Sequence, residues 1–174
     1  MLIGRIGVTK ARNATGSAAA AQALAWAEQL GALYVERPHN MSVDELMAQY
    51  DLAALVVGEK DGPRIHSDAG SFAYHPGMAV LRLQQLKRGA TEHLLTALDL
   101  RPGKRVLDAT LGLAADAAIS SYAVGEAGTV VGLEASPLLH FAVSYGLQHY
   151  VAEDADLTVA LRRIQLVQAL AEDY

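Results

Sequence analysis

The 174-residue chain contains no cysteine, so disulfide frameworks, thiolate zinc sites and cysteine nucleophiles are excluded. The same absence favours a cytoplasmic protein. No window approaches about 18 consecutive apolar residues, so the sequence predicts no membrane-spanning helix. The start of the chain lacks the small-residue cleavage site of a signal peptide. The six histidines include no pair at three- or four-residue spacing, and we expect no metal site.

Positive charge is scarce in the second half of the chain. Residues 1–104 carry 11 lysine or arginine residues and 10 acidic ones, whereas residues 105–174 carry 3 and 9. We do not expect the acidic half to bind a nucleic-acid backbone by itself. A polyanion would be held by the first half, where the loop Thr9–Asn13 offers Lys10 and Arg12 to a phosphate, or by another chain. The alternative is that this loop is solvated and that the charges only keep the surface soluble.

Alternating apolar and helix-forming segments predict a small α/β subdomain over residues 1–70. The expected strands are 2–8, 33–35, 53–57 and 64–66, and the expected helices are 17–30 and 43–50. The second helix has a well-defined start, because Ser42 and Glu45 stand at the spacing of a capping box. Gly31 is suited to end the first helix.

Residues 71–104 are expected to form a linker and two helices. Ser67–Gly77 contains turn-forming residues and is interpreted as the linker. Pro76 can begin the first helix, because its missing N–H would have no partner at a helix start in any case. Thr91 is the expected N-cap of the second helix.

From Arg105 onward the pattern predicts a βαβαβ unit, the N-terminal half of a Rossmann-like sheet. The expected strands are 105–108, 129–134 and 163–167, and the expected helices are 116–124, 137–150 and 154–161. Asp108 and Glu134 each end a strand, 26 residues apart. That separation suits a loop, a helix and a short return. We therefore expect the two strands to be neighbours, with both carboxylates at one edge of the sheet.

The loop after the first of these strands discriminates between two classes of nucleoside cofactor. A dinucleotide requires a Gly-x-Gly-x-x-Gly loop around its pyrophosphate. Here only Gly112 is present, Ala114 stands at the next expected glycine, and acids flank the loop on both sides. These acids, Asp108 and Asp116, repel a pyrophosphate and attract the cationic groups of S-adenosylmethionine. Glu134, at the tip of the second strand, can accept hydrogen bonds from both ribose hydroxyls.

The run Asp108-Ala-Thr-Leu-Gly-Leu-Ala-Ala-Asp116-Ala resembles motif I of class I S-adenosylmethionine-dependent methyltransferases. It is most similar to the motif of the small-subunit ribosomal RNA guanine-N2 methyltransferase family, and Leu133-Glu-Ala-Ser-Pro137 resembles that family's next motif. The resemblance covers residues 74–174 and implies an S-adenosylmethionine cofactor and an RNA acceptor. The cofactor site that it implies consists of Asp108, Ala109, Thr110, Gly112, Asp116, Glu134, Ala135 and Ser136. The family usually has glycine where this chain has Ala114.

The catalytic motif of such enzymes is an Asp/Asn-Pro-x-aromatic segment after a fourth strand. It is not found at any of the five prolines, so no catalytic residue is assigned. We expect a chain truncated after its third strand. The open edge of that strand would then be covered by a partner chain, such as a second copy, or by a rearranged helix.

Two other functions remain open at this point. One is a module that binds S-adenosylmethionine or its demethylated product without catalysis, or that serves as an interaction partner, and the absent catalytic motif favours it. The other is a nicotinamide-dependent oxidoreductase, which uses the same kind of sheet. The single loop glycine argues against the oxidoreductase.

Overall fold

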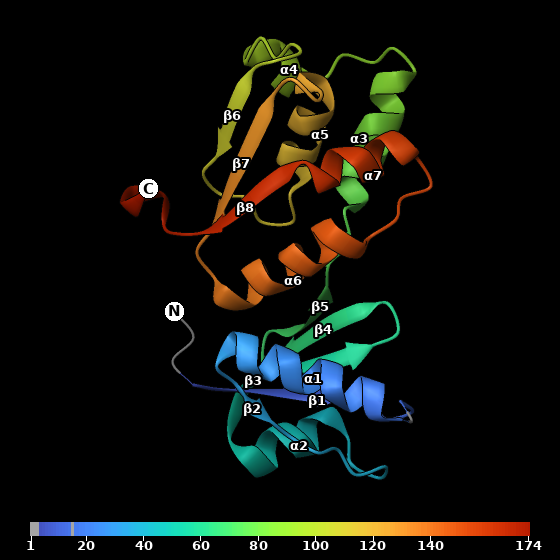
Figure 1. Ribbon diagram of the computed structural model, residues 1–174, viewed down its shortest axis with the longest axis vertical. Helices are drawn as coiled ribbons and strands as arrows, with labels where there is room; N and C mark the ends of the chain where they lie inside the picture. The colour runs from blue at the N-terminus through green and yellow to red at the C-terminus, as the bar shows by residue number, and fades with distance from the viewer. Residues whose placement is uncertain (1–3, 15) are drawn as a thin grey trace. The chain divides into compact units, whose positions relative to one another are not determined.

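The computed structural model describes residues 4–14 and 16–174, which form two compact units that divide between Tyr74 and His75 (Figure 1). Each unit has a sheet of its own. Leu2 and Ile3, at the start of the expected first strand, lie outside the described residues. None of the described helices is long and apolar enough to cross a membrane.

The first unit is built on a five-stranded mixed sheet. Its elements are β1 (Arg5–Lys10), α1 (Ser17–Leu30), β2 (Leu33–Tyr34), α2 (Val43–Tyr50), β3 (Leu52–Glu59), β4 (Gly62–Ser67) and β5 (Gly70–Ala73). The strand order is β2-β1-β3-β4-β5. β1 is parallel to both β2 and β3, and the two remaining pairings are antiparallel. The α/β character predicted for this segment is confirmed.

The helix ends of the first unit follow the turn chemistry of the sequence. The Ser42 hydroxyl accepts the Glu45 N–H at 3.1 Å, and the Glu45 carboxylate accepts the Ser42 N–H at 2.7 Å. These two bonds complete the predicted capping box at the start of α2. Gly31 ends α1 in the left-handed conformation, with φ of 59°, also as predicted.

Strand β5 was not expected, because the sequence pattern predicts a linker over Ser67–Gly77. β5 pairs antiparallel with β4, and its first three residues are exposed. A short strand at the edge of a sheet needs no continuous apolar run, since much of its surface meets solvent. Its glycine and serine therefore favour a turn in the sequence pattern even though the backbone is paired.

The second unit contains a three-stranded parallel sheet. Its elements are α3 (Gly77–Lys87), α4 (His93–Ala97), β6 (Arg105–Asp108), α5 (Ala115–Val124), β7 (Thr129–Glu134), α6 (Pro137–His149), α7 (Ala155–Arg162), β8 (Ile164–Gln168) and the 3₁₀ helix η1 (Ala171–Asp173). The strand order is β6-β7-β8. The predicted βαβαβ unit is therefore present. β6 and β7 are neighbours, and both β6 and β8 are edge strands of this sheet.

Helix α5 is the centre of the second unit. Figure 1 shows it between the sheet and helices α3 and α7, and it contacts all of them. Ala117, Ala118 and Ile119 in this helix are fully buried. The Ser121 hydroxyl donates to the carbonyl oxygen of Ala160 in α7 at 2.7 Å. The small side chains let α5 approach both the sheet and the outer helices, so the hydrophobic core of this unit is built around α5.

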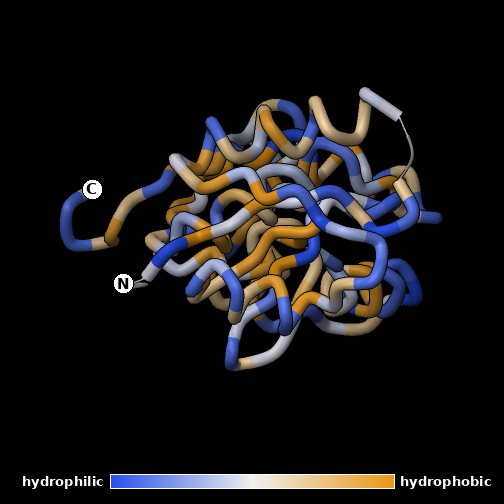
Figure 2. Tube along the Cα trace, turned by 90° about the horizontal axis from the view of Figure 1, so that it is seen from below, coloured by the Kyte–Doolittle hydropathy of each residue, from blue (hydrophilic) through white to orange (hydrophobic). Residues whose placement is uncertain are grey.

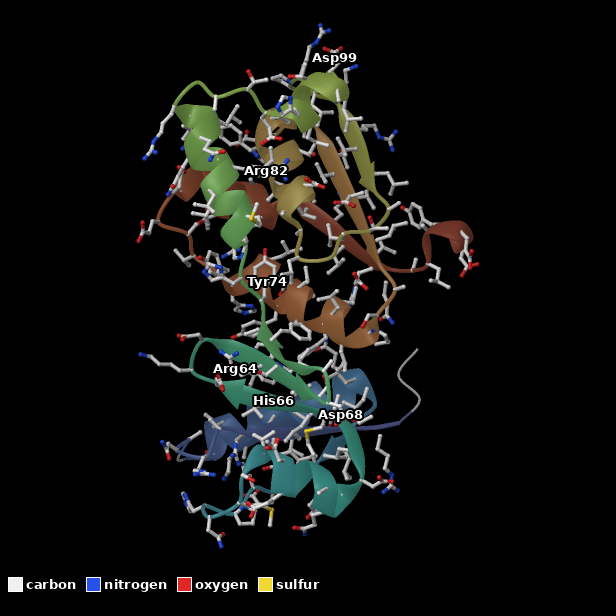
Figure 3. The ribbon with its side chains drawn as sticks, turned by 180° about the vertical axis from the view of Figure 1, so that it is seen from behind. Arg64, His66, Asp68, Tyr74, Arg82 and Asp99 are labelled. Carbon is white, nitrogen blue, oxygen red and sulfur yellow. The ribbon has the colours of Figure 1, made fainter. Side chains whose placement is uncertain are left out.

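The N-cap of α4 differs from the prediction. The Glu92 carboxylate, not the Thr91 hydroxyl, accepts the Leu94 N–H, at 3.3 Å. Arg82 in α3, labelled in Figure 3, donates to both oxygens of the same carboxylate, at 3.0 and 2.8 Å. A local propensity favours threonine as a cap. Here the ion pair with Arg82 holds the Glu92 carboxylate at the helix start, where it caps α4 instead.

Candidate functional site

A pocket of about 490 Å³ lies at the carboxyl ends of the three parallel strands of the second unit. Its walls come from the loop after β6, the end of β7 and the segment after β8. The lining residues are Ala109, Thr110, Gly112, Leu133, Glu134, Ala135, Ala169, Leu170, Ala171 and Glu172. The pocket thus brings together five of the eight site residues predicted from the sequence, namely Ala109, Thr110, Gly112, Glu134 and Ala135.

The strand register explains why these residues meet. Asp108 at the end of β6 is paired with Gly132 of β7, and Glu134 is paired with Gln168 of β8. All three strands run in the same direction, so their carboxyl ends open at one edge of the sheet. Ligands of open parallel sheets bind at this edge.

The loop after β6 is attached to β7 by Leu111. Its N–H donates to the carbonyl oxygen of Leu133 at 2.9 Å. Its side chain is 4% exposed and packs against Gly132. A Cβ at Gly132 would lie 2.4 Å from Leu111 Cδ1, which no packed pair of carbons can tolerate. Gly132 therefore leaves the room that lets the loop lie on the strand, and sequence reasoning had missed this role.

Gly112 needs its glycine for backbone conformation and for open space. Its φ is +52°, in the left-handed region. A Cβ there would have Thr110 O, at 3.9 Å, as its only near neighbour outside the adjacent residues. Because Gly112 lines the pocket, a side chain at this position would enter the open space rather than the core.

Ala114 also adopts a left-handed conformation, with φ of 62°, at the N-cap of α5. It is fully buried, and it is not among the residues that line the pocket. Its methyl group therefore packs inside the unit. A non-glycine residue in this conformation costs about 1–2 kcal/mol, so the alanine strains the backbone without narrowing the pocket.

Asp108 lies half-buried beside the pocket, although it is not part of the lining. Its Oδ1 accepts the Thr110 N–H at 3.1 Å, which holds the first residues of the loop in a turn. Burial raises the pKa of the Asp108 carboxyl, the Thr110 bond opposes this change, and the charge of Asp116 adds to the increase. The carboxylate is thus costly to keep ionised, which is typical of functional positions.

Glu134 is the carboxylate inside the pocket. Its Oε1 accepts the Ser136 N–H at 2.7 Å, which fixes the direction of the side chain. Its Oε2 has no hydrogen bond to any described residue. Ser136 does not line the pocket, but its hydroxyl caps α6 by accepting the Leu139 N–H at 3.4 Å. Glu134 therefore presents one oriented oxygen to a ligand.

Asp116 lies apart from the pocket lining. Its Oδ1 is 2.5 Å from Nη1 of Arg82, and Arg82 also binds Glu92. These two partners raise the pKa of the Arg82 guanidinium. Figure 3 shows Arg82 reaching from α3 toward α5. In this structure Asp116 thus belongs to an ion-pair cluster that joins α3, α4 and α5.

The segment after β8 completes the pocket, and it was not predicted from the sequence. The Ala169 N–H donates to the carbonyl oxygen of Glu134 at 3.2 Å, which ties this segment to the end of β7. Figure 2 shows that the chain beyond it is apolar first and hydrophilic at the end. Leu170 is half exposed and Glu172 adds a second carboxylate to the lining. The one sequence feature that could have indicated this wall is its position directly after the third parallel strand, where ligands of such sheets bind.

No metal centre is found in residues 4–14 and 16–174, where no three histidine or acidic side chains form a group that could hold an ion. His75, just before α3, packs edge-on against Tyr150 with ring centroids 5.5 Å apart. It does not line the pocket.

Comparison with known sequences finds one curated relative of this chain at 36% identity. No protein-family model matches the chain. The uncharacterized protein YpiP of Bacillus subtilis (strain 168) is 36% identical over 128 residues, which are 74% of this chain and 50% of YpiP. The chain therefore spans about half the length of this curated relative.

Among solved structures, the S-adenosylmethionine-dependent methyltransferase NGO1261 of Neisseria gonorrhoeae aligns over 96% of this chain and 61% of its own, with a TM-score of 0.57 and 15% identity. At this identity the likeness establishes the architecture. The chain has a mixed α/β fold with a Rossmann-like sheet of the methyltransferase type, as predicted from its sequence.

Proposed function

We propose that the pocket binds S-adenosylmethionine and that the chain is the cofactor-binding portion of a methyltransferase. The proposal rests on the orientation of the Glu134 carboxylate. The Ser136 N–H orients this carboxylate at 2.7 Å, the other oxygen has no hydrogen bond to any described residue, and Glu134 lines the pocket. That oxygen is suited to accept the ribose hydroxyls of an adenosine. A volume of about 490 Å³ lies within the usual range for small-molecule sites.

The charges around the pocket favour a cationic nucleoside. Its lining contains two carboxylates, Glu134 and Glu172, and no lysine or arginine. Asp108 lies directly beside it. A pyrophosphate would meet repulsion and no charged donor, whereas a sulfonium and an ammonium would be attracted. The lining therefore argues against the nicotinamide dinucleotide alternative.

The apolar part of the lining suits an adenine ring. Leu133 belongs to β7, and the segment after β8 contributes the wall of Ala169, Leu170 and Ala171. In the proposed pose Glu134 holds the ribose between this wall and the loop at Gly112. The loop, with Asp108, then faces the methionine part. The motif resemblance also assigns Asp116 to this part, which requires the carboxylate to leave Arg82.

When bound, the cofactor would supply a methyl group on its sulfonium. An acceptor would attack the methyl carbon in line with the C–S bond, and S-adenosylhomocysteine would leave as a neutral thioether. The residues of this chain would orient the nucleoside and stabilise its charge, which are the main contributions to such a transfer. We further propose an RNA base as the acceptor, on the motif resemblance. The five prolines at positions 38, 63, 76, 102 and 137 include no catalytic Asp/Asn-Pro-x-aromatic motif. This absence supports the alternative of a module that binds the cofactor without catalysis.

Edge strand β6 supports a proposal about assembly. Leu107 on this strand is 54% exposed, although it lies in a parallel sheet, and such strands are usually covered. We propose that another polypeptide segment, such as a second copy of the chain, covers this sheet. Sedimentation equilibrium tests the second-copy form, for which a dimer is expected and a monomer at all concentrations is the contrary result.

Titration calorimetry with S-adenosylhomocysteine and with NAD tests the proposed cofactor. We expect a single saturable site for S-adenosylhomocysteine and no heat of binding for NAD. Saturable binding of NAD with none of S-adenosylhomocysteine would select the oxidoreductase. For the acceptor, the full-length protein is incubated with tritiated S-adenosylmethionine and small-subunit ribosomal RNA. Incorporation supports an RNA methyltransferase, and cofactor binding without transfer supports the non-catalytic module.

A further inference from the structure

Two guanidinium groups meet at one backbone carbonyl in the first unit. Nη2 of Arg12 lies 3.0 Å from the carbonyl oxygen of Met41, and Nε of Arg37 lies 3.1 Å from the same oxygen. Both nitrogens donate hydrogen bonds to it. Arg12 follows β1 and Arg37 follows β2. Because β1 and β2 are parallel neighbours, their carboxyl ends lie at the same edge of the sheet, which brings the two side chains together.

No carboxylate of the described residues forms an ion pair with either guanidinium, although the pKa of Glu45 is lowered by its bonds with Ser42 and also by the charge of Arg12. In the part of the chain that the structure describes, no Asp or Glu oxygen lies within 4.0 Å of either guanidinium. Two acids of the same region are engaged elsewhere. Glu36 accepts the Tyr34 hydroxyl at 2.7 Å and pairs with Lys10 at 3.0 Å, and Glu45 completes the capping box with Ser42. Two positive charges therefore share one neutral acceptor.

The electrostatics of the pair favour a bound anion. Burial lowers the pKa of Arg37, and the charge of Arg12 lowers it further. Both groups nevertheless remain protonated, because a guanidinium does not lose its proton in proteins. Arg12 uses only Nη2 and Arg37 only Nε for the bonds described, so further N–H groups are available on each. An anion between them would relieve the repulsion and accept these N–H groups.

We propose that Arg12 and Arg37 bind one phosphate group. A guanidinium matches the spacing of phosphate oxygens with a planar fork, and two of them balance the charge of about −1.5 to −2 on a phosphate monoester. A long polyanion is disfavoured, because residues 1–74 contain six lysine or arginine residues and eight acidic ones. The terminal phosphate of a nucleotide offers this monoester charge, and one backbone phosphate of an RNA offers similar oxygens with a single negative charge. This site lies within the first unit and does not depend on the cofactor pocket.

Titration calorimetry of the full chain at constant ionic strength tests the proposal. The probes are inorganic pyrophosphate and a short single-stranded RNA with and without a 5′-phosphate. We expect pyrophosphate to bind at one site, and the double variant Arg12→Gln/Arg37→Gln to weaken it at least about tenfold. Binding of RNA only when it carries the 5′-phosphate identifies a terminal phosphate, and equal binding of both RNAs identifies the backbone.

Arg64→Gln is the matched control. Arg64 is in β4 of the same unit (Figure 3), but its Nε already pairs with Glu59 at 2.9 Å. This variant should bind pyrophosphate as the wild type does. If the double variant does not fold, Arg12→Gln alone carries the test, because Arg12 is exposed, and a loss of at least about threefold is expected.

Equal affinity of the wild type and these Arg12 and Arg37 variants would overturn the proposal, and so would the absence of saturable binding to the wild type. Binding of S-adenosylhomocysteine, measured on the same samples, should be unchanged. A failure of the phosphate site is thereby distinguished from a failure of the proposed cofactor site.

Discussion

The side chain of Leu111 fills the space next to Gly132. An added Cβ at position 132 would approach Leu111 Cδ1 to 2.4 Å and Leu111 Cγ to 3.0 Å. The same leucine donates its N–H to the carbonyl oxygen of Leu133 at 2.9 Å. One buried leucine thus holds the loop that contains Thr110 and Gly112 against β7. Only glycine at position 132 leaves room for this contact.

Gly132→Ala should therefore destabilise the second unit and disturb the pocket. Overpacking of this kind costs about 1–3 kcal/mol, measured as the loss of free energy of unfolding in urea. Binding of S-adenosylhomocysteine should weaken as well, because the loop is displaced. Adding Leu111→Ala provides the control. It restores the space, so the double variant should be more stable than the sum of the two single effects predicts. Additive effects would contradict the contact.

Gly112→Val should block the pocket and should also cost some stability. A valine at this φ of +52° strains the backbone, and its side chain enters the open space of the pocket. We expect S-adenosylhomocysteine binding to fall at least about a hundredfold, as a filled site requires. Gly31→Val is the matched control, because Gly31 has a similar φ of 59° with nothing near its Cβ. It should lose stability while keeping the affinity.

Arg82→Gln should weaken the second unit through Glu92. The Glu92 side chain is only 14% exposed, and its charge would remain largely desolvated and without its arginine partner. We expect a loss of about 2–3 kcal/mol in the free energy of unfolding at pH 7. Arg88→Gln is the control, since Arg88 is exposed and has no ion pair among the described residues. This control should be neutral.

The same ion pair sets a pH dependence. Arg82 lowers the pKa of Glu92 below its ordinary value. The stabilisation is therefore complete above the unfolded-state value of about 4.3 and is lost as the pH falls through the lower folded-state value. Urea unfolding between pH 3 and 7 should show this loss in the wild type. An Arg82→Gln variant with the same acid-induced loss would contradict the assignment.

Asp108→Asn should increase the stability of the protein and weaken its binding of S-adenosylmethionine. Burial raises the pKa of the Asp108 carboxyl, so the folded state holds its proton more tightly than the unfolded state does. The cost of the ionised group therefore appears as the pH rises through the unfolded-state pKa, and it is fully present above the folded-state pKa. Asparagine keeps an acceptor for the Thr110 N–H without the charge. At pH 7 the variant should unfold at higher urea and bind S-adenosylmethionine at least about threefold more weakly.

The parts of the site predicted from the sequence are those fixed by local chemistry and by strand direction. Asp108 and Glu134 end their strands directly after the apolar runs Val106–Leu107 and Val130–Leu133 of the sequence. Parallel strands then bring both ends to one edge. Gly112 is predictable for a similar reason, since a tight loop between a strand and a helix needs a left-handed position. The capping box at Ser42 is equally local.

The parts that escaped prediction depend on contacts distant in the sequence. Arg82 meets Asp116 across 34 residues, and no periodicity encodes that pairing. The same arginine makes Glu92 rather than Thr91 the cap of α4. The pocket wall at Ala169 has no motif, because small apolar residues are recognised only by what they face. Nothing in the sequence distinguishes Gly132 from an ordinary strand residue, because its role depends on the contact with Leu111.

The most direct test of the cofactor site compares Glu134→Ala with Glu126→Ala in calorimetric titrations with S-adenosylmethionine. Glu126 is an exposed glutamate in the same unit and does not line the pocket. We expect wild-type affinity for Glu126→Ala and a loss of about 1.5–3 kcal/mol for Glu134→Ala, at least about tenfold in affinity. Equal binding by both variants, or no binding by the wild type, would contradict the proposed cofactor site.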